Sequence, residues 1–167
     1  MPTVMHYKAV KQILRYLKGT VQYGIVYTKG GETEVIIDYT DSDLAGDMDD
    51  RKSNGGMTFY INDSLVSWNS QKHKTVALSF CEAEFMAATA AACQALWLRN
   101  PIFHGRSKHI DTKFHFIREC VEEGHIEVDF ICTEEQRANA LMKALPTVKL
   151  AVMRHLLGVC ELDPRQD

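Results

Sequence analysis

Glu34-Val-Ile-Ile-Asp-Tyr-Thr-Asp-Ser-Asp-Leu-Ala-Gly-Asp-Met-Asp-Asp-Arg-Lys-Ser53 is the stretch of sequence on which the fold depends. Its first half, residues 34–40, is rich in β-branched side chains and follows Gly30-Gly31, so it predicts a strand. Its second half predicts a tight, acid-rich turn. Asp41 lies where the strand becomes the turn. A carboxylate at a strand end can reach a metal or a substrate while the sheet holds its backbone, and α/β sheets place their binding sites there.

The charge distribution changes abruptly beside this stretch. Residues 1–29 carry five Lys or Arg and no acid, whereas residues 32–50 carry eight Asp or Glu and no base. The whole chain has a net charge of −3, so binding of nucleic acid would depend on a local basic patch. An acidic turn next to a basic helix is also an ordinary solvated surface, and charge alone leaves both interpretations open.

Length and composition indicate one globular domain with room for an appended helix, because the chain has 167 residues of which 46% are hydrophobic. We find neither an apolar run long enough to span a bilayer nor the apolar core of a secretory signal. We therefore expect an intracellular protein, cytoplasmic or nuclear, with no membrane partner. The five cysteines form no Cys-x-x-Cys pair, and we interpret them as reduced thiols in the core.

The N-terminal segment, residues 4–18, has the spacing of an amphipathic helix, and Gly19 supplies its end. Apolar side chains form one stripe along it and cations form a second stripe. Four cations without an intervening acid can follow a phosphate backbone, although most basic stripes are only solvated faces. The apolar stripe contains Tyr7, Val10, Leu14 and Leu17, and the basic stripe contains Lys8, Lys11, Arg15 and Lys18.

The rest of the chain predicts several further elements. Residues 21–28 and 34–40 are expected to form a hairpin through Gly30-Gly31, and a second hairpin is expected after Gly55-Gly56. A central helix begins at Ser79, with Glu82 completing a capping box, and Glu84 lies in line with a series of alanines. The remaining predictions are strands at 57–61, 65–69 and 126–132, and helices at 79–98, 111–123, 133–145 and 148–157.

Ordered strings of residues along nearly the whole chain resemble the Pol polyprotein of copia-type retrotransposons, from the end of its reverse transcriptase through its ribonuclease H domain to its C-terminus. The resemblance divides the chain into a connecting helix at 1–20, a ribonuclease H-like domain at 21–146, and a C-terminal helix and tail at 147–167. The strings that carry it include Ile13–Thr20, Tyr39–Asp47, Thr75–Ser79, Glu82–Ala87, Lys108–Asp111, Thr133–Ala138 and Lys143–Pro146.

The resemblance implies an α/β fold, a ribonuclease H-like mixed sheet with flanking helices. The family hydrolyses RNA in RNA–DNA hybrids with two Mg²⁺ (or Mn²⁺) ions held by four carboxylates. Asp41 and Glu84 match the first two of these. Asn139 stands at the fourth position, where an amide replaces a carboxylate. The third position lies in a strand-plus-helix unit, on the order of 30 residues, that is missing between residues 99 and 100.

Three functional hypotheses follow. The first, which we favour, is a ribonuclease H-like domain that is impaired or inactive, with Mg²⁺ or Mn²⁺ bound weakly or lost. The second is an active nuclease in which Asp38, Asp43 or Asp129 replaces a lost ligand. The third is a non-enzymatic module that binds protein or nucleic acid, including RNA–DNA hybrids. The expected nucleic-acid contacts are Lys8, Lys11, Arg15, Lys18, Arg106, Lys108 and His109.

The missing unit would also remove a central parallel strand and leave the strand at residues 35–39 without its inner neighbour. Such an edge must be filled or protected. The segment at 126–132 could move in, a second copy could pair there and form a homodimer, or the region could stay loose. Because its side chains alternate as in a half-buried strand, we predict that segment 126–132 lies parallel to strand 35–39.

Overall fold

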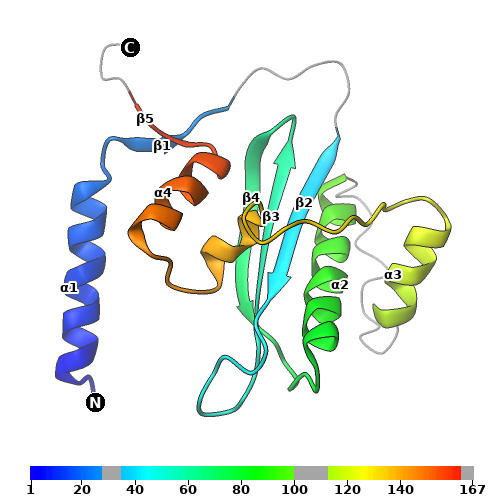
Figure 1. Ribbon diagram of the computed structural model, residues 1–167, viewed down its shortest axis with the longest axis horizontal. Coiled ribbons are helices and arrows are strands. Elements are labelled where there is room, and N and C mark those ends of the chain that lie inside the picture. The colour runs from blue at the N-terminus through cyan, green and yellow to red at the C-terminus, as the bar shows by residue number, and fades with distance from the viewer. Residues whose placement is uncertain (28–34, 100–112, 163–167) are drawn as a thin grey trace.

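The computed structural model describes residues 1–27, 35–99 and 113–162, with side chains from 117 onward in the last range (Figure 1). It confirms the predicted α/β class, because helices accompany two small antiparallel sheets. The elements are α1 (Val4–Gly19), β1 (Tyr23–Ile25), β2 (Ile36–Ser42), β3 (Asn54–Ile61), β4 (Ser64–Lys72), α2 (Phe80–Arg99), α3 (Lys113–Glu122), the 3₁₀ helix η2 (Arg137–Leu141), α4 (Thr147–Leu156) and β5 (Val159–Glu161).

The larger sheet has the order β2-β3-β4, and both of its pairings are antiparallel. The predicted strand at 34–40 is confirmed as β2, and the predicted hairpin is confirmed as β3 and β4 with longer strands. Its turn contains Asn62 and Asp63, whose φ angles are 49° and 61°. Asn and Asp tolerate this left-handed conformation, which matches the twist of a two-residue hairpin.

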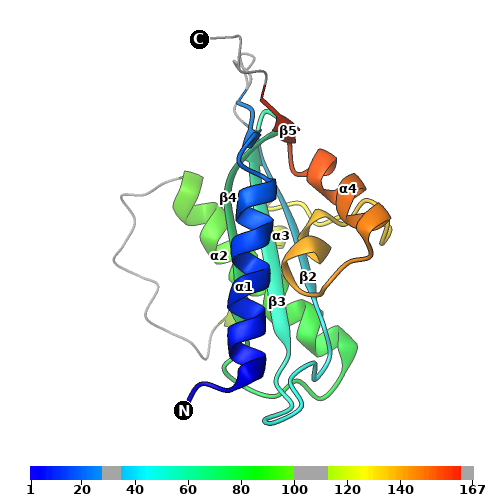
Figure 2. The same ribbon diagram turned by 90° about the vertical axis from the view of Figure 1, so that its left-hand side faces the viewer.

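Helix α2 covers one face of this sheet and η2 covers the other (Figures 1 and 2). The core under α2 contains Met57, Phe59 and Ala91. Successive side chains of a strand point to opposite faces, so Tyr60, which follows Phe59, points to the η2 face. Tyr39 follows Asp38, the partner of Phe59, and therefore points to the η2 face too. There the Arg137 guanidinium lies over both rings, 4.6 Å and 4.4 Å from their centroids.

The predicted hairpin between residues 21–28 and 34–40 is wrong. Strand β1 instead pairs antiparallel with β5, with Gly24 opposite Cys160. A side chain at Gly24 would meet Leu162, because a Cβ there would lie 2.8 Å from Leu162 Cδ1. The sequence pattern predicted that the strand at 21–28 pairs with the next strand along the chain, whereas in the structure the C-terminal strand β5 is the partner of β1. The Gly30-Gly31 turn lies outside the described residues.

The segment at 126–132 forms no strand, so the prediction that it lies parallel to β2 is wrong. Its alternating apolar side chains are not buried on one face, since Val128 is 62% and Phe130 97% exposed. Within the described residues β2 therefore remains an edge strand. The helix predicted at 133–145 is also wrong in length, because only the 3₁₀ helix η2 forms there. Its cap is the Gln136 side chain and not Thr133.

The four long helices are confirmed within a few residues of their predicted bounds. Ser79 Oγ accepts from the Glu82 backbone N–H at 3.1 Å, as predicted, while the Glu82 carboxylate accepts from Leu78 rather than from the cap residue. No described helix is both long and apolar enough to cross a membrane. The five cysteines are free thiols, as predicted. Their predicted place in the core is confirmed only for Cys120, and it is wrong for Cys81, Cys132 and Cys160, which are exposed.

Candidate functional site

Asp41 lies near the end of β2, directly opposite Gly56 on β3. Its side chain is partly buried, and its Oδ1 accepts from the Ser42 backbone N–H at 2.9 Å. Burial raises the pKa of Asp41, and the Ser42 hydrogen bond and the positive charge of Lys143 oppose this shift. A partly buried carboxylate at a strand end, with a cation nearby, can bind a metal ion or a donor group of a substrate.

Two adjacent glycines of β3 allow both covering elements to approach this end of the sheet. A Cβ at Gly56 would lie 2.8 Å from the Ala138 carbonyl oxygen in η2, so Gly56 faces η2. A Cβ at Gly55 would lie 3.4 Å from the Ala87 Cβ in α2, so Gly55 faces α2. Paired residues point to the same face, so Asp41 shares the face of Gly56 and η2.

Asn139 lies in η2 on the same face as Asp41, and its side chain is buried, with 1% exposure. Its Nδ2 donates to the Thr133 carbonyl oxygen at 3.2 Å. Its Oδ1 is buried and accepts no hydrogen bond from the described residues. A buried acceptor without a partner has lost its hydration, so this oxygen is available to a donor or a cation.

Glu84 lies in α2, on the opposite side of the sheet, and its residue is exposed. Ala87, one turn further along, marks the α2 face that meets Gly55. The two predicted catalytic carboxylates therefore approach the strand end from different faces. Throughout the described ranges, no group of three or more His, Cys, Asp or Glu side chains is arranged to hold a metal.

The acidic turn after β2 uses several of its carboxylates to hold its own backbone. Asp43 Oδ1 accepts from the Asn54 N–H at 2.7 Å. Asp47 Oδ1 accepts from the backbone of Asp49 and Asp50, and its Oδ2 is 2.6 Å from Lys72 Nζ. These bonds, with Lys72 first, lower the pKa of Asp47 to about 2. Much of the negative charge of this stretch thus stabilises a turn.

The three acids that could replace a lost ligand have distinct positions. Asp43 is already bonded to Asn54. Asp38 belongs to the α2 face by the alternation of β2, away from Asp41, and burial raises its pKa. Asp129 is exposed, in the segment that forms no strand. Of the three, only Asp43 lies close enough to Asp41 to act on it, since its negative charge contributes to the raised pKa of Asp41.

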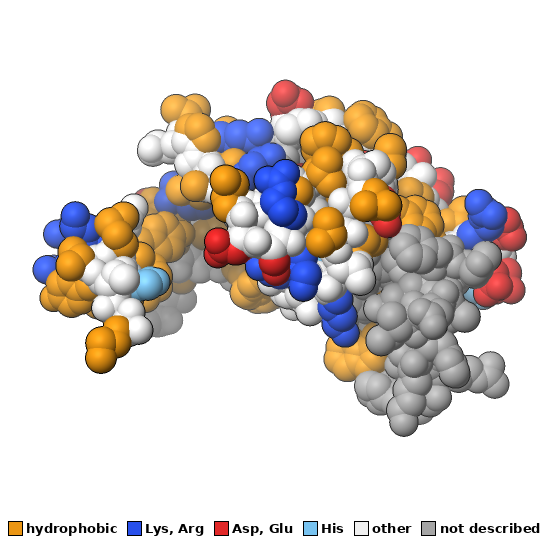
Figure 3. Space-filling model, turned by 90° about the horizontal axis from the view of Figure 1, so that it is seen from below, with side chains coloured by type: hydrophobic (Ala, Val, Ile, Leu, Met, Phe, Trp, Pro, Cys, Tyr) orange, Lys and Arg blue, Asp and Glu red, His pale blue; other side chains and the backbone are white. Residues whose placement is uncertain are grey.

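The basic residues of α1 are exposed, and the helix lies apart from the body of the domain (Figure 3). Lys11 Nζ lies 4.9 Å from the centroid of the Tyr7 ring. The predicted contacts Arg106, Lys108 and His109 lie outside the described residues. The structure therefore separates the basic helix from the Asp41 site and does not bring them into one surface.

Sequence reasoning did not anticipate the roles of Lys143 and Arg137. Lys143 acts on Asp41 through its charge, and Arg137 stacks on Tyr39 and Tyr60. Both lie far from β2 along the sequence, so no local pattern could have shown the contact. The tyrosine rings themselves meet edge to face, with centroids 5.5 Å apart.

These features define an α/β domain with a carboxylate site at a strand end. The chain is 36% identical to the retrovirus-related Pol polyprotein from transposon TNT 1-94 of Nicotiana tabacum, over 95% of this chain and 14% of that protein. It is 33% identical to the Pol polyprotein from transposon RE2 of Arabidopsis thaliana, over 98% of this chain and 13% of that protein. It is 44% identical to secreted RxLR effector protein 161 of Plasmopara viticola, over 58% of this chain and 68% of that protein.

The relatives that match nearly the whole chain are copia-type, retrovirus-related Pol polyproteins of plant transposons, and these homologues support a retroelement-derived domain. The chain spans about one seventh of the length of the plant polyproteins. No family model matches the chain. No solved structure matches it either.

Proposed function

We propose that the chain is a ribonuclease H-like domain of retroelement origin in which hydrolysis of RNA in RNA–DNA hybrids is impaired or lost. The observation that carries this proposal is the environment of Asn139. It is a buried amide in η2, against the strand that bears Asp41, at a position where the resemblance expects a carboxylate. An amide supplies one neutral oxygen, which neutralises none of the charge of a divalent ion.

The donors on the η2 face, the Asp41 carboxylate and the unpartnered Asn139 Oδ1, would hold Mg²⁺ or Mn²⁺ at most weakly. Glu84, the other expected ligand, lies on the opposite side of the sheet. When bound, such ions activate water and stabilise the leaving oxygen, which requires two of them about 4 Å apart. Two carboxylates and an amide supply too little negative charge to hold such a pair.

The test is a labelled RNA–DNA hybrid incubated with the pure chain and Mg²⁺ or Mn²⁺. We expect little or no cleavage with Mg²⁺. The Asp41→Asn variant is the matched control, because it removes a candidate ligand while preserving size. Robust cleavage that disappears in Asp41→Asn would overturn the proposal and support an active nuclease with a substitute ligand. Asp38→Asn, Asp43→Asn and Asp129→Asn would then identify that ligand.

A second candidate function is nucleic-acid binding by α1. Its four basic residues are exposed and α1 contains no acid, so it can contact phosphates without opposing charge. Affinity should fall steeply with salt and depend little on sequence, because phosphate contacts release counterions and read no bases. Replacing Lys8, Lys11, Arg15 and Lys18 by Gln should flatten the salt dependence. An unchanged slope would exclude this role for the helix.

A third candidate role is the binding of a protein partner, a second copy of the chain, at the free edge of β2. Pairing of two copies along this edge would complete the sheet in the way that the homodimer hypothesis requires. The edge is already partly protected, because the Gln136 Nε2 donates to the Thr40 carbonyl oxygen at 3.0 Å. The backbone of Ile36 faces the free edge, because the alternate residues of β2 bond to β3, so disruption of a dimer by Ile36→Pro without loss of the fold would support edge pairing.

A further inference from the structure

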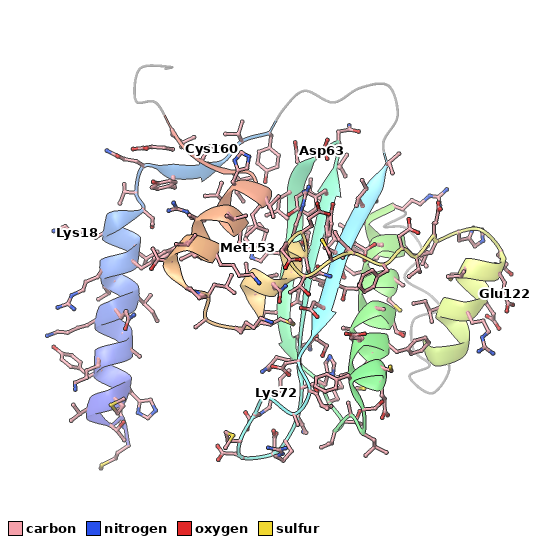
Figure 4. All side chains as sticks on the ribbon, viewed as in Figure 1. Lys18, Asp63, Lys72, Glu122, Met153 and Cys160 are labelled. Atoms are coloured by element: carbon pink, nitrogen blue, oxygen red, sulfur yellow. The ribbon has the colours of Figure 1, made fainter. Side chains whose placement is uncertain are left out.

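Among the described elements, α3 makes its main packing contact with α2. Figure 4 shows α3, marked by Glu122, alongside α2 at the end of the molecule away from Lys18 on α1. The buried residues among the described side chains of α3 are Ile117 and Cys120, which are 6% and 5% exposed. They lie three positions apart, so they share one side of the helix, and the packing contact indicates that this side faces α2.

A second thiol, Cys93, lies on α2 and is half-buried. The groove between the two helices is lined on the α2 side by Phe85 and Ala88. At about 100° per residue, Cys93 is turned by about 80° from Phe85 in one direction, whereas Ala88 is turned by about 60° in the other. Cys93 therefore borders the contact with α3 on the side that is turned away from the groove.

Cys120 has the matching position on α3. The groove is lined on the α3 side by Ile117 and Val121. From Ile117, Val121 is turned by about 40° toward the groove and Cys120 by about 60° in the opposite direction. Both thiols therefore border the same helix contact, on its side away from the groove.

The electrostatic surroundings of Cys120 agree with a neighbouring thiol. Burial raises the pKa of Cys120, and the negative charges of Glu123, Cys93 and Glu119 add to this shift. Glu119 and Glu123 are close to Cys120 along the chain, whereas Cys93 belongs to another helix. Charges in salt solution act on each other mainly within about 10 Å, so the Cys93 and Cys120 sulfurs lie near each other across the contact.

We propose that Cys93 and Cys120 are a redox pair, which a peroxide converts to a disulfide that joins α3 to α2. The remaining cysteines, Cys81, Cys132 and Cys160, are all exposed and none borders this contact. Thiols reverse the bond, so α3 is fixed to α2 under oxidising conditions and is held by packing alone under reducing conditions. This role requires neither nuclease activity nor a metal at Asp41.

The oxidation proceeds in two steps. Cys93 is the less buried of the two thiols, so its thiolate attacks one oxygen of hydrogen peroxide. The O–O bond breaks, and the products are a sulfenic acid on Cys93 and hydroxide. Cys120 then loses its proton and attacks the Cys93 sulfur, the S–O bond breaks, and a second hydroxide leaves. The two thiol protons convert both hydroxides to water, so two thiols and one peroxide give one disulfide and two waters.

The experiment exposes the full chain to one equivalent of hydrogen peroxide at about pH 8, where thiolate is available. The free thiols are then alkylated, and the peptides are mapped without reduction. We expect a linked peptide pair that contains Cys93 and Cys120. The variant Cys81→Ser/Cys132→Ser/Cys160→Ser should form the same bond, lose the mass of two hydrogen atoms and take up no alkylating agent. Adding Cys93→Ser to this variant is the matched control, and Cys120 should then remain a free thiol.

A second measurement follows the effect of the bond on α3. Amide hydrogen exchange in α3 should be slower after oxidation of the full chain, should return to the starting rate with dithiothreitol, and should not respond to peroxide when Cys93 is replaced by Ser. The linked peptides come from the parent chain, so this result does not depend on whether the variants fold. Alkylation of both Cys93 and Cys120 after oxidation, or a bond from either of them to an exposed cysteine instead, would overturn the proposal. A bond that leaves exchange in α3 unchanged would exclude its role in fixing the helix.

Discussion

The Gln136 side chain of η2 hydrogen-bonds to the backbone of Thr40 in β2, with 3.0 Å between Nε2 and the carbonyl oxygen. The same side chain accepts from the Ala138 N–H at 3.2 Å through its Oε1. One amide thus caps η2 and ties it to the strand that bears Asp41. The contact joins residues 96 positions apart, so it holds the two halves of the candidate site together.

Replacing Gln136 by Ala should remove both bonds and leave a partly buried backbone acceptor on the edge strand. We expect a loss of about 1 kcal/mol in the free energy of unfolding. Chemical denaturation followed by tryptophan fluorescence measures it. Gln12→Ala on the exposed α1 is the control and should leave the midpoint unchanged. Equal effects of the two substitutions would contradict the role assigned to Gln136.

The Gly56→Ala substitution should separate η2 from the sheet. Its Cβ would lie 2.8 Å from the Ala138 carbonyl oxygen, a backbone atom that cannot move without shifting η2. We expect destabilisation by about 1–3 kcal/mol, as for other overpacked sites. Gly19→Ala is the control, because a Cβ there meets nothing within 4 Å. If Gly56→Ala proves as stable as the parent in thermal unfolding, η2 is not packed on Gly56.

Asn139→Asp should not restore hybrid cleavage, because under the proposed function the third carboxylate and its strand would still be missing. It should also destabilise the fold by about 1–3 kcal/mol, since a buried carboxylate would face the Thr133 carbonyl oxygen without a donor. Cleavage assays and denaturation measure the two effects. Asn69→Asp, on the exposed part of β4, is the control for the charge change. Recovered cleavage in Asn139→Asp would refute the proposed loss of the metal cage.

Asp38→Asn should stabilise the protein at pH 7. Burial raises the pKa of Asp38 from 3.8, so the fold favours its protonated form. The stability that this group contributes is present below pH 3.8 and is lost as pH rises through the raised pKa. The variant should therefore be more stable than the parent at neutral pH, and this difference in stability should disappear in acid. Thermal unfolding at several pH values tests this, and a pH-independent difference would exclude the mechanism.

The Asp47–Lys72 pair should give the opposite pH dependence. The pKa of Asp47 is about 2 in the folded state, against an ordinary value of 3.8 for an aspartate side chain. Its stabilising effect is present above pH 3.8 and is lost as pH falls toward 2. Lys72→Gln should raise the pKa of Asp47, which an NMR titration of its carboxyl carbon measures. Its effect on the stability of the fold should be smallest at about pH 2, where Asp47 is partly protonated. Lys74→Gln is the control. An unshifted Asp47 titration in Lys72→Gln would show that the ion pair does not form in solution.

The sequence predicted the elements whose signals are local. The helix at 4–19 follows from its period and from Gly19, and α2 begins where Ser79 was expected to cap it. The β3–β4 hairpin follows from Asn62 and Asp63 between two strand-forming runs. Each of these signals lies within a few residues of the element that it produces, so the local sequence is enough to predict that element.

Tertiary structure decided the partners of these elements. Strand β1 pairs with β5 rather than with β2, and the alternating segment at 126–132 forms no strand. Alternation indicates that a segment can bury one face, but not that a neighbouring strand is available to pair with it. The available surface depends on where distant segments pack, which no local pattern contains.

The candidate site divides in the same way. The sequence predicted Asp41 as a site residue because a strand-to-turn boundary and the motif of the resemblance coincide there, and the structure places it near the end of β2. Only the fold shows that Glu84 belongs to the opposite face, that Asn139 is buried, and that Lys143 acts on Asp41. Side-chain direction, burial and electrostatic neighbours are properties of packed elements. The sequence therefore determined which groups this protein carries, and the tertiary structure decided which of them meet, because contacts across a sheet depend on strand register and on the elements that cover each face.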